Sequence, residues 1–342
     1  MDVLTTLPAA LDPADAPTVR RALVARRGRG DRIFFGGATL SGMSVLAIMG
    51  AVGVFLAIEA KQALVKAGPR FLTTAEWDTD RGRFGVSAVL VGTVLIAVVA
   101  VAVALPIALG TSLFITEIAP TWMRSWLVAL VDLMAAVPSV VYGLWGFFLL
   151  EGQIVGLSRW INKWFDWLPF FKVAGANPNS PLSSASVYTA SAFVAGVVVA
   201  MMVLPIACVV MRQVFSQVPL GEREGAFALG STRWGMIRVV ALPFARGGII
   251  GGTMLGLGRA LGETIAVVLI ISPSFKINFH LLQAGTNSVS SLIAIRFNET
   301  SPGIGLSALF AAGLVLFAIT LLINFTASWF ISRSRSGASS EA

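Results

Sequence analysis

Cysteine and histidine are almost absent from this chain, which has one of each among its 342 residues. The single cysteine, Cys208, lies inside an apolar run, so no disulfide bond can form within the chain. The single histidine, His280, is far from that thiol in sequence and has no acidic cluster beside it, which argues against a metal site. Ser-His-Asp and Cys-His catalysis lack their partners for the same reason. We therefore expect no catalytic residues, no metal and no cofactor.

A phosphate-binding G-x-x-x-x-G-K-[ST] loop is also missing, so any nucleotide hydrolysis must occur on another chain. Charged residues make up only 12% of the chain and hydrophobic residues make up 56%. A soluble domain carries roughly twice that charged fraction, so the apolar excess must face lipid. The net charge of +8 is spread between the apolar runs, whereas a nucleic-acid-binding protein would gather it on one face. This distribution indicates orientation signals and contact with anionic membrane lipid.

Six apolar runs meet the length of about 20 residues that a helix needs to span hydrocarbon. All should be helices, because backbone groups in lipid must be satisfied within the segment. Pro106, Pro138 and Pro205 fall inside three of the runs, where we expect kinks. The sequence therefore predicts an all-α integral membrane protein with six transmembrane helices, at roughly Ile33–Ile58, Gly85–Ile115, Trp126–Leu150, Val187–Met211, Gly247–Ser272 and Ile304–Ile331.

The polar ends and loops predict an orientation. Residues 1–32 carry six arginines next to the first run and lack the features of a cleaved signal peptide, so they are expected to form a cytoplasmic tail. The membrane domain would cover 33–332, and 333–342 would be a second cytoplasmic tail. Residues 151–186, on the outer side, contain aromatic residues at helical spacing, which predicts a helix lying flat at the interface: Trp160, Trp164, Trp167 and Phe171.

A polar, arginine-rich loop at about 212–246 joins the fourth and fifth runs. Small residues would let a short helix lie close to a partner surface, and Gly230 would end that helix by adopting positive φ. Such a short helix is not stable alone and needs a docking surface. Pro243 is expected to stop a second helix before the fifth run begins. The residues of this pattern are Glu224, Gly225, Ala226, Gly230, Leu242 and Pro243.

This pattern resembles the cytoplasmic coupling loop of ABC importer permeases, in which E-A-A is followed by G and then by I-x-L-P. Gly225 replaces the first alanine of the pattern and Val240 replaces the isoleucine. Two further stretches, 135–146 and 258–264, resemble the PstC-type permease of phosphate-specific ABC transporters. The resemblance covers about residues 33–331. It implies the type I ABC importer permease fold in a bacterial inner membrane, a PstA-type second permease subunit, two PstB-type ATPase subunits and a PstS-type phosphate-binding protein.

Charges inside the apolar runs are the candidates for contact with a translocated substrate. Arg259 lies 12 residues into the fifth run, roughly 18 Å deep, beyond easy snorkelling range. Glu263 follows at i+4 and is expected to neutralise it in part, and glycines nearby would permit close backbone approach. A guanidinium suits a tetrahedral oxyanion, because its planar fork donates two parallel hydrogen bonds. The alternative for this pair is a structural cement between helices. Asp132, in the third run, would face an inward vestibule, or else gate or pair with Arg259.

The sequence therefore predicts a permease that moves inorganic phosphate inward, with ATP hydrolysis on a separate subunit. An alternative cargo is another oxyanion, such as molybdate, sulfate or phosphonate. An ion-coupled secondary transporter is disfavoured by the coupling pattern and by the lack of a clear two-fold repeat of spans. A membrane enzyme is disfavoured by the missing catalytic constellation.

Overall fold

The computed structural model describes residues 28–175 and 185–334. The chain divides into two units, Met1–Val52 and Gly53–Ala342. The described part of the first unit is a single helix with an exposed surface, the start of α1. The helices are α1 (Arg29–Glu59), α2 (Lys61–Ala67), α3 (Ser87–Leu113), α4 (Thr121–Ala136), α5 (Ser139–Trp145), α6 (Glu151–Phe165), α7 (Ala192–Ser216), α8 (Leu220–Ala228), α9 (Arg233–Met236), α10 (Leu242–Gly262), α11 (Ile265–Ile270), α12 (Val289–Arg296) and α13 (Ile304–Ser334).

Six helices of the described residues are long and apolar enough to cross a membrane, which confirms the predicted all-α, six-span class. Four of them lie close to a predicted span, and the third and fifth are displaced along the chain, to Ser139–Phe165 and Arg233–Gly262. The first helix begins at Arg29, inside the stretch expected to be a tail. Most of both predicted tails, 1–27 and 335–342, lies outside the described residues. The spans are Gly30–Glu59, Ser87–Ile118, Ser139–Phe165, Ala192–Ser216, Arg233–Gly262 and Ile304–Trp329.

The third apolar run is broken rather than continuous, so its predicted extent is wrong. Helix α4 ends at Ala136, and α5 starts after Pro138, whose φ and ψ of −61° and 143° are extended. In an unbroken helix the Met134 carbonyl would accept from residue 138, but proline has no N–H. That carbonyl instead accepts from the Val137 amide at 3.4 Å and from the Tyr142 hydroxyl at 2.9 Å. Proline thus ends the helix, and a tyrosine one turn beyond it satisfies the freed carbonyl.

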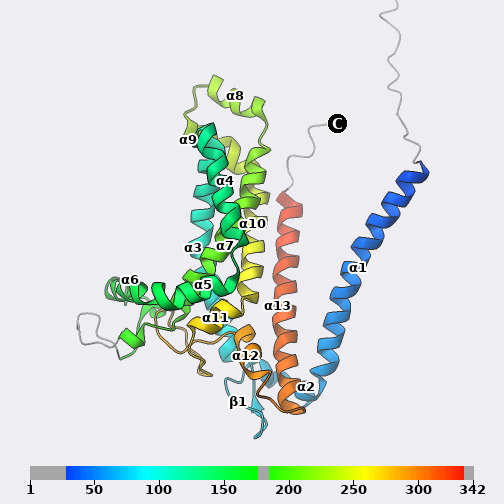
Figure 1. The fold of residues 1–342 in the computed structure, drawn as a ribbon, viewed down its shortest axis with the longest axis vertical. Helices are drawn as coiled ribbons and strands as arrows, with labels where there is room; N and C mark the ends of the chain where they lie inside the picture. The colour runs from blue at the N-terminus through cyan, green and yellow to red at the C-terminus, as the bar shows by residue number, and fades with distance from the viewer. Residues whose placement is uncertain (1–27, 176–184, 335–342) are drawn as a thin grey trace, which may run out of the picture. The chain divides into compact units, whose positions relative to one another are not determined.

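The helical path continues without a stop from α5 through a π turn, η4 (Gly146–Leu150), into α6. Figure 1 shows α5 and α6 running across the direction of α4, α7 and α10. The helix predicted in the outer loop is therefore present, although it ends at Phe165, before Trp167 and Phe171. Its exposed aromatic residues include Trp160 and Trp164. Its buried side contains Asn162, whose amide oxygen accepts from the buried Tyr188 hydroxyl at 3.2 Å.

Helix α7 forms the centre of the second unit and packs against α3, α10 and α4. Glycines of α10 allow its backbone to approach α7 closely. A Cβ built on Gly248 would lie 2.3 Å from Val214, and one built on Gly256 would lie 2.5 Å from Val203. Pro106 and Pro205 lie within continuous helices, α3 and α7, so the break at Pro138 is not a general effect of proline in this chain.

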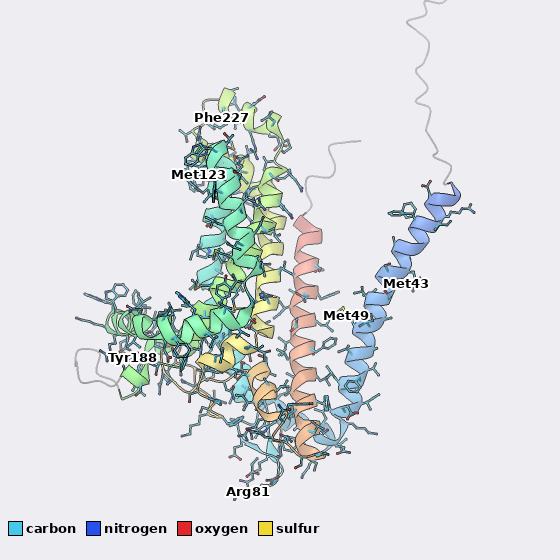
Figure 2. All side chains as sticks on the ribbon, viewed as in Figure 1. Met43, Met49, Arg81, Met123, Tyr188 and Phe227 are labelled. Carbon is cyan, nitrogen blue, oxygen red and sulfur yellow. The ribbon has the colours of Figure 1, made fainter. Side chains whose placement is uncertain are left out.

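The two ends of this bundle differ in structure. At one end, α8 and α9 project beyond the long helices; at the other lie α2, α12 and the short hairpin of β1 (Trp77–Asp78) and β2 (Arg83–Phe84). Figure 2 shows Phe227 of α8 and Arg81 of the hairpin at these opposite ends, with Met123 of α4 at the same end as Phe227. We call them the α8 end and the hairpin end. The Ser307 hydroxyl of α13 bonds to both sides of the junction between α1 and α2 at the hairpin end. It donates to the Glu59 carbonyl at 2.6 Å and accepts from the Ala63 amide.

Candidate functional site

Two interrupted helices meet inside the bundle and bring together the two short stretches singled out in the sequence. Helix α10 ends at Gly262, the chain is extended at Glu263, and α11 begins at Ile265. Helix α5, which follows the break at Pro138, packs against α11. The contact is close, because a Cβ built on Gly143 would lie 2.8 Å from the Ala266 Cα atom. The stretches 135–146 and 258–264, far apart in the chain, therefore form one region.

Glu263 lies at the break between α10 and α11 and is buried, with 9% of its surface exposed. Its carboxylate accepts from the Ala266 backbone amide at 3.3 Å, which satisfies a first-turn N–H of α11. Its backbone carbonyl accepts from the Ser290 hydroxyl at 2.7 Å. Glu263 is thus held at both its side chain and its backbone, and its carboxylate serves the start of a helix.

The expected pairing of Arg259 with Glu263 is wrong, since the ion pairs among the described residues do not include one between these two side chains. The i+4 argument requires a continuous helix, and α10 ends one residue before Glu263. Arg259 is instead exposed on this chain.

The glycines near Arg259 do not support close packing around it. A Cβ built on Gly262 would meet nothing within 4 Å, and one on Gly258 would only touch Asn324 at 3.6 Å. The close approaches along α10 occur at Gly248, Gly252 and Gly256, where the neighbour is α7. These glycines therefore serve the packing of α10 against α7, and the surface beside Arg259 is open.

Asp132 lies on α4, and its partner is Arg212 of α7, at 3.8 Å between Oδ1 and Nη2. The side chain of Asp132 is 53% exposed and that of Arg212 is 22% exposed. The alternative in which Asp132 pairs with Arg259 is therefore not what the structure has. Asp132 belongs to a basic region nearer the α8 end.

Helix α8 carries Glu224, Gly225 and Ala226, and it ends as the sequence predicts. Gly230 has φ +82°. Its amide donates to the Phe227 carbonyl at 2.9 Å, and the Ser231 amide donates to the Ala226 carbonyl at 3.1 Å. These two bonds form the Schellman arrangement, in which a glycine in the left-handed region satisfies the last carbonyls of a helix. Glu224 and Gly225 are exposed, so the face of α8 that carries them is free in this chain.

The prediction that Pro243 stops a helix is wrong. The helical path runs from Arg233 to Gly262, and Leu242 and Pro243 lie at the start of α10 within it. A π turn, η7 (Ile237–Ala241), precedes them. The wider turn shifts the carbonyls that the proline ring would otherwise meet, so the helix continues past a residue that cannot donate.

The family follows from comparison with known proteins. A family model described as "Binding-protein-dependent transport system inner membrane component" matches residues 107–336, well over half of the chain. The chain belongs to this family. The match includes both interrupted helices and the whole of α8, so the site described above lies within the family's own domain.

Curated relatives within this family are similar over nearly the whole chain. The phosphate transport system permease protein PstC 2 of Mycobacterium tuberculosis is 35% identical over 318 residues, 91% of this chain and 96% of the relative. The phosphate transport system permease protein PstC of Pasteurella multocida is 37% identical over 280 residues, which are 82% of this chain and 84% of that relative. PstC of Mesorhizobium japonicum is 34% identical over 339 residues, 98% and 99%. The resemblance to PstC-type permeases is therefore confirmed, and these relatives are named as permeases, not as enzymes.

Among solved structures, a chain of the inward-facing MetNI methionine ABC transporter matches with a TM-score of 0.49 and 14% sequence identity. The match covers 71% of this chain and 93% of the MetNI chain.

Sequence reasoning missed the contacts that hold α8 to the rest of this permease-family chain. Arg223, on α8, lies 3.1 Å from a carboxylate oxygen of Glu117 in η3 (Phe114–Ile118), the π turn that follows α3. Its guanidinium also donates to the Phe215 carbonyl of α7 at 2.7 Å. The Glu117 side chain is only 4% exposed. A lone glutamate at the end of an otherwise apolar run was the available signal, because such a charge needs a partner.

Proposed function

We propose that this chain is the membrane-spanning permease subunit of an ATP-driven importer of inorganic phosphate in a bacterial inner membrane. The observation that carries the proposal is the near full-length similarity to proteins named phosphate transport system permease protein PstC. The chain supplies the path for the anion, and ATP is hydrolysed on another subunit. Both termini and the α8 end are assigned to the cytoplasm.

In this proposal α8 transmits the ATPase cycle to the membrane helices. Support comes from its exposed face with Glu224 and Gly225, its sharp end at Gly230, and its attachment to α3 and α7 through Arg223. Helix α8 has nine residues and none of them is buried in this chain, so it is marginal alone and needs a docking partner, which in this proposal is an ATPase subunit. The coupling set comprises Glu224, Gly225, Ala226, Gly230, Leu242 and Pro243.

The proposed transient ligand of the passing phosphate is Arg259. A charge deep in a membrane span must face water, a partner or a substrate, and Arg259 is exposed on this chain without a carboxylate partner among the described residues. Glu263 then acts as a positioning residue: it caps α11 at the break and leaves the arginine free to bind an anion. Asp132, held near Arg212, would act further along the path, toward the cytoplasm.

The assembly that fits this function has a PstA-type second permease subunit, two PstB-type ATPase subunits on the cytoplasmic side and a PstS-type phosphate-binding protein on the outer side. The exposed surface at Arg259 supports a second permease subunit, because pairing would enclose a pathway that this chain leaves open on one side.

The test is uptake of labelled phosphate into vesicles that hold the reconstituted complex, with and without ATP. Arg259→Gln should abolish ATP-dependent uptake while the protein stays in the membrane, because a neutral amide is easier to insert than a charge. Arg259→Lys should retain part of the uptake, since an ammonium group keeps the positive charge but cannot donate two parallel hydrogen bonds. Arg246→Gln, an exposed arginine near the start of the same helix, is the matched control. Near-normal uptake by Arg259→Gln would end the ligand assignment.

The same vesicles separate the other functions. Competition by molybdate, sulfate or phosphonate stronger than competition by phosphate would assign another oxyanion. Uptake that persists without any ATPase subunit would favour a secondary transporter. The exchange of both charges, Arg259→Glu with Glu263→Arg, should destroy uptake, because Glu263 caps a helix rather than pairing with Arg259. Preserved uptake in that variant would support a cementing pair.

A further inference from the structure

A cavity of about 210 Å³ opens at the α8 end of the bundle, away from Arg259. It lies between the end of α3, the start of α4 and the end of α7. Two arginines line it together with an amide and two hydroxyl groups: Ile115, Thr116, Arg124, Val128, Arg212, Gln213 and Ser216. None of the six residues of the coupling set lines this cavity, and its one link to the proposed phosphate pathway is Arg212, which pairs with Asp132.

Arg124 is held in a fixed position at the wall of this cavity. Its Nε donates to the Ile115 carbonyl at 2.9 Å, and its Nη2 donates to the Thr116 carbonyl. These are carbonyls at the end of the α3 path, which a cation stabilises. Within the described part of the chain, the remaining terminal nitrogen of the Arg124 guanidinium has no hydrogen bond to a carbonyl. A pre-positioned guanidinium loses little further freedom when it binds an anion.

Arg212 has unused donor capacity on the other wall. Its nearest carboxylate, Asp132, is 3.8 Å from Nη2, which is at the limit of an ion pair, and that carboxylate is half exposed. Its Nε is buried and has no hydrogen-bond partner among the described residues. A buried guanidinium N–H without a partner is costly, and its presence beside a cavity indicates that something else supplies the acceptor. The cavity therefore has two positive groups and one distant, partly screened negative group.

The surroundings place this cavity at a membrane interface. Trp122 and Trp126, one turn apart in the first part of α4, are 72% and 70% exposed. Tryptophan gathers where headgroups meet hydrocarbon. Figure 2 shows Met123, between them in sequence, at the α8 end. Basic pockets between membrane helices on the cytoplasmic side are suited to acidic headgroups.

We propose that this cavity binds the phosphate group of an anion, through Arg124 and Arg212, at the cytoplasmic interface. The group has two sources: the phosphodiester of an anionic lipid such as phosphatidylglycerol, or free inorganic phosphate. The guanidinium of Arg212 donates its unused N–H groups to the phosphate oxygens. Arg124, held in place by its bonds to two carbonyls, supplies the second positive charge. The binding does not depend on which anion the complex imports.

The test uses the full-length chain, purified in detergent with its co-purifying subunits and stripped of lipid. Native mass spectrometry measures retention of added phosphatidylglycerol against phosphatidylcholine, and equilibrium dialysis measures labelled inorganic phosphate. We expect one of these phosphate sources to bind, and binding to fall about tenfold for each charged contact removed in Arg124→Gln and Arg212→Gln. Arg246→Gln, with the same loss of charge outside the cavity, should bind normally. Added salt should weaken the retained binding.

Arg124→Gln also removes the bonds to the end of the α3 path, so the arginine variants are compared with a further variant that keeps both arginines. Ser216→Phe narrows the cavity from the exposed end of α7 and should weaken binding as the arginine variants do. Selective retention of phosphatidylglycerol identifies a lipid site, and saturable binding of inorganic phosphate identifies a subsite for the free anion. Equal retention of both lipids together with no phosphate binding would overturn the proposal. So would binding that Ser216→Phe and Arg212→Gln leave unchanged.

Discussion

The ion pair between Arg223 and Glu117 gives the sharpest test of how α8 is attached to the membrane helices. The Glu117 side chain is 4% exposed and that of Arg223 is 20% exposed, so the carboxylate is the more deeply buried partner. Arg223→Gln would leave Glu117 as an uncompensated buried charge and would also remove the bond to the Phe215 carbonyl. Breaking a fully buried pair costs about 3–5 kcal/mol; partial exposure of the arginine reduces this to about 2–3 kcal/mol here.

The reverse change should cost less. Glu117→Gln removes the buried charge, while Arg223 keeps its bond to Phe215 and part of its hydration, so we expect a loss of about 1 kcal/mol. The double variant should be no less stable than Arg223→Gln alone, because the uncompensated charge is gone. Its cost would then fall below the sum of the two single costs by about 1 kcal/mol or more.

The assay is thermal unfolding of the purified complex in detergent at one fixed scan rate, followed by loss of the monodisperse peak in size-exclusion chromatography. For a chain of this size, a loss of 2–3 kcal/mol corresponds to a fall in Tm of about 3–4 °C. Arg238→Gln, an exposed arginine in the same loop, is the control. The pair does not attach α8 as described if Arg223→Gln has the same Tm as the control. The same conclusion follows if the double variant loses as much stability as the two single variants together. Uptake should fall in Arg223→Gln even at temperatures where the complex stays folded.

Four further outcomes can be checked. Gly230→Pro cannot adopt positive φ or donate from its backbone, so the protein should insert while ATPase co-purification or phosphate uptake falls; normal values of both would refute the coupling role. Gly256→Ala should lower thermal stability by about 1–3 kcal/mol, because the new methyl meets α7, whereas Gly110→Ala meets nothing within 4 Å and should not destabilise. Tyr142→Phe should cost about 1–2 kcal/mol through a lost hydrogen bond, with a matching fall in Tm. Deletion of residues 1–15, which lie well before the residues 107–336 matched by the family model, should leave uptake largely intact at equal membrane abundance.

The sequence predicts the features of this chain that depend on local chemistry. Apolar run length identifies the long helices, since a spanning helix needs a fixed number of residues. The end of α8 at Gly230 follows from the ease with which glycine adopts positive φ. Both are properties of short segments, so no knowledge of neighbouring helices is needed.

Features that depend on packing are harder to predict. Three prolines lie in similar apolar runs, yet only Pro138 breaks its helix, where Tyr142 satisfies the freed carbonyl. The helix continues through Pro243 because a π turn precedes it, and no sequence pattern predicts that π turn. The spacing of Arg259 and Glu263 predicts a pair, but α10 ends between them and the Glu263 carboxylate bonds to the first turn of α11. Partners distant in the chain, such as Arg223 with Glu117, require the fold itself.

The bond from Tyr142 to the Met134 carbonyl also has a consequence for the order of events during biosynthesis. The donor follows its acceptor by eight residues and lies beyond the proline, so α4 is synthesised before the group that completes its end exists. Before that group exists, the Met134 carbonyl has only the long bond from the Val137 amide, at 3.4 Å, and a poorly satisfied carbonyl is costly in hydrocarbon. We therefore expect α4 to remain near the translocation machinery until α5 has emerged, so that the two segments enter the bilayer together. A chain truncated between Pro138 and Tyr142 should then integrate less well than one truncated just after Tyr142, which a glycosylation-mapping insertion assay can measure.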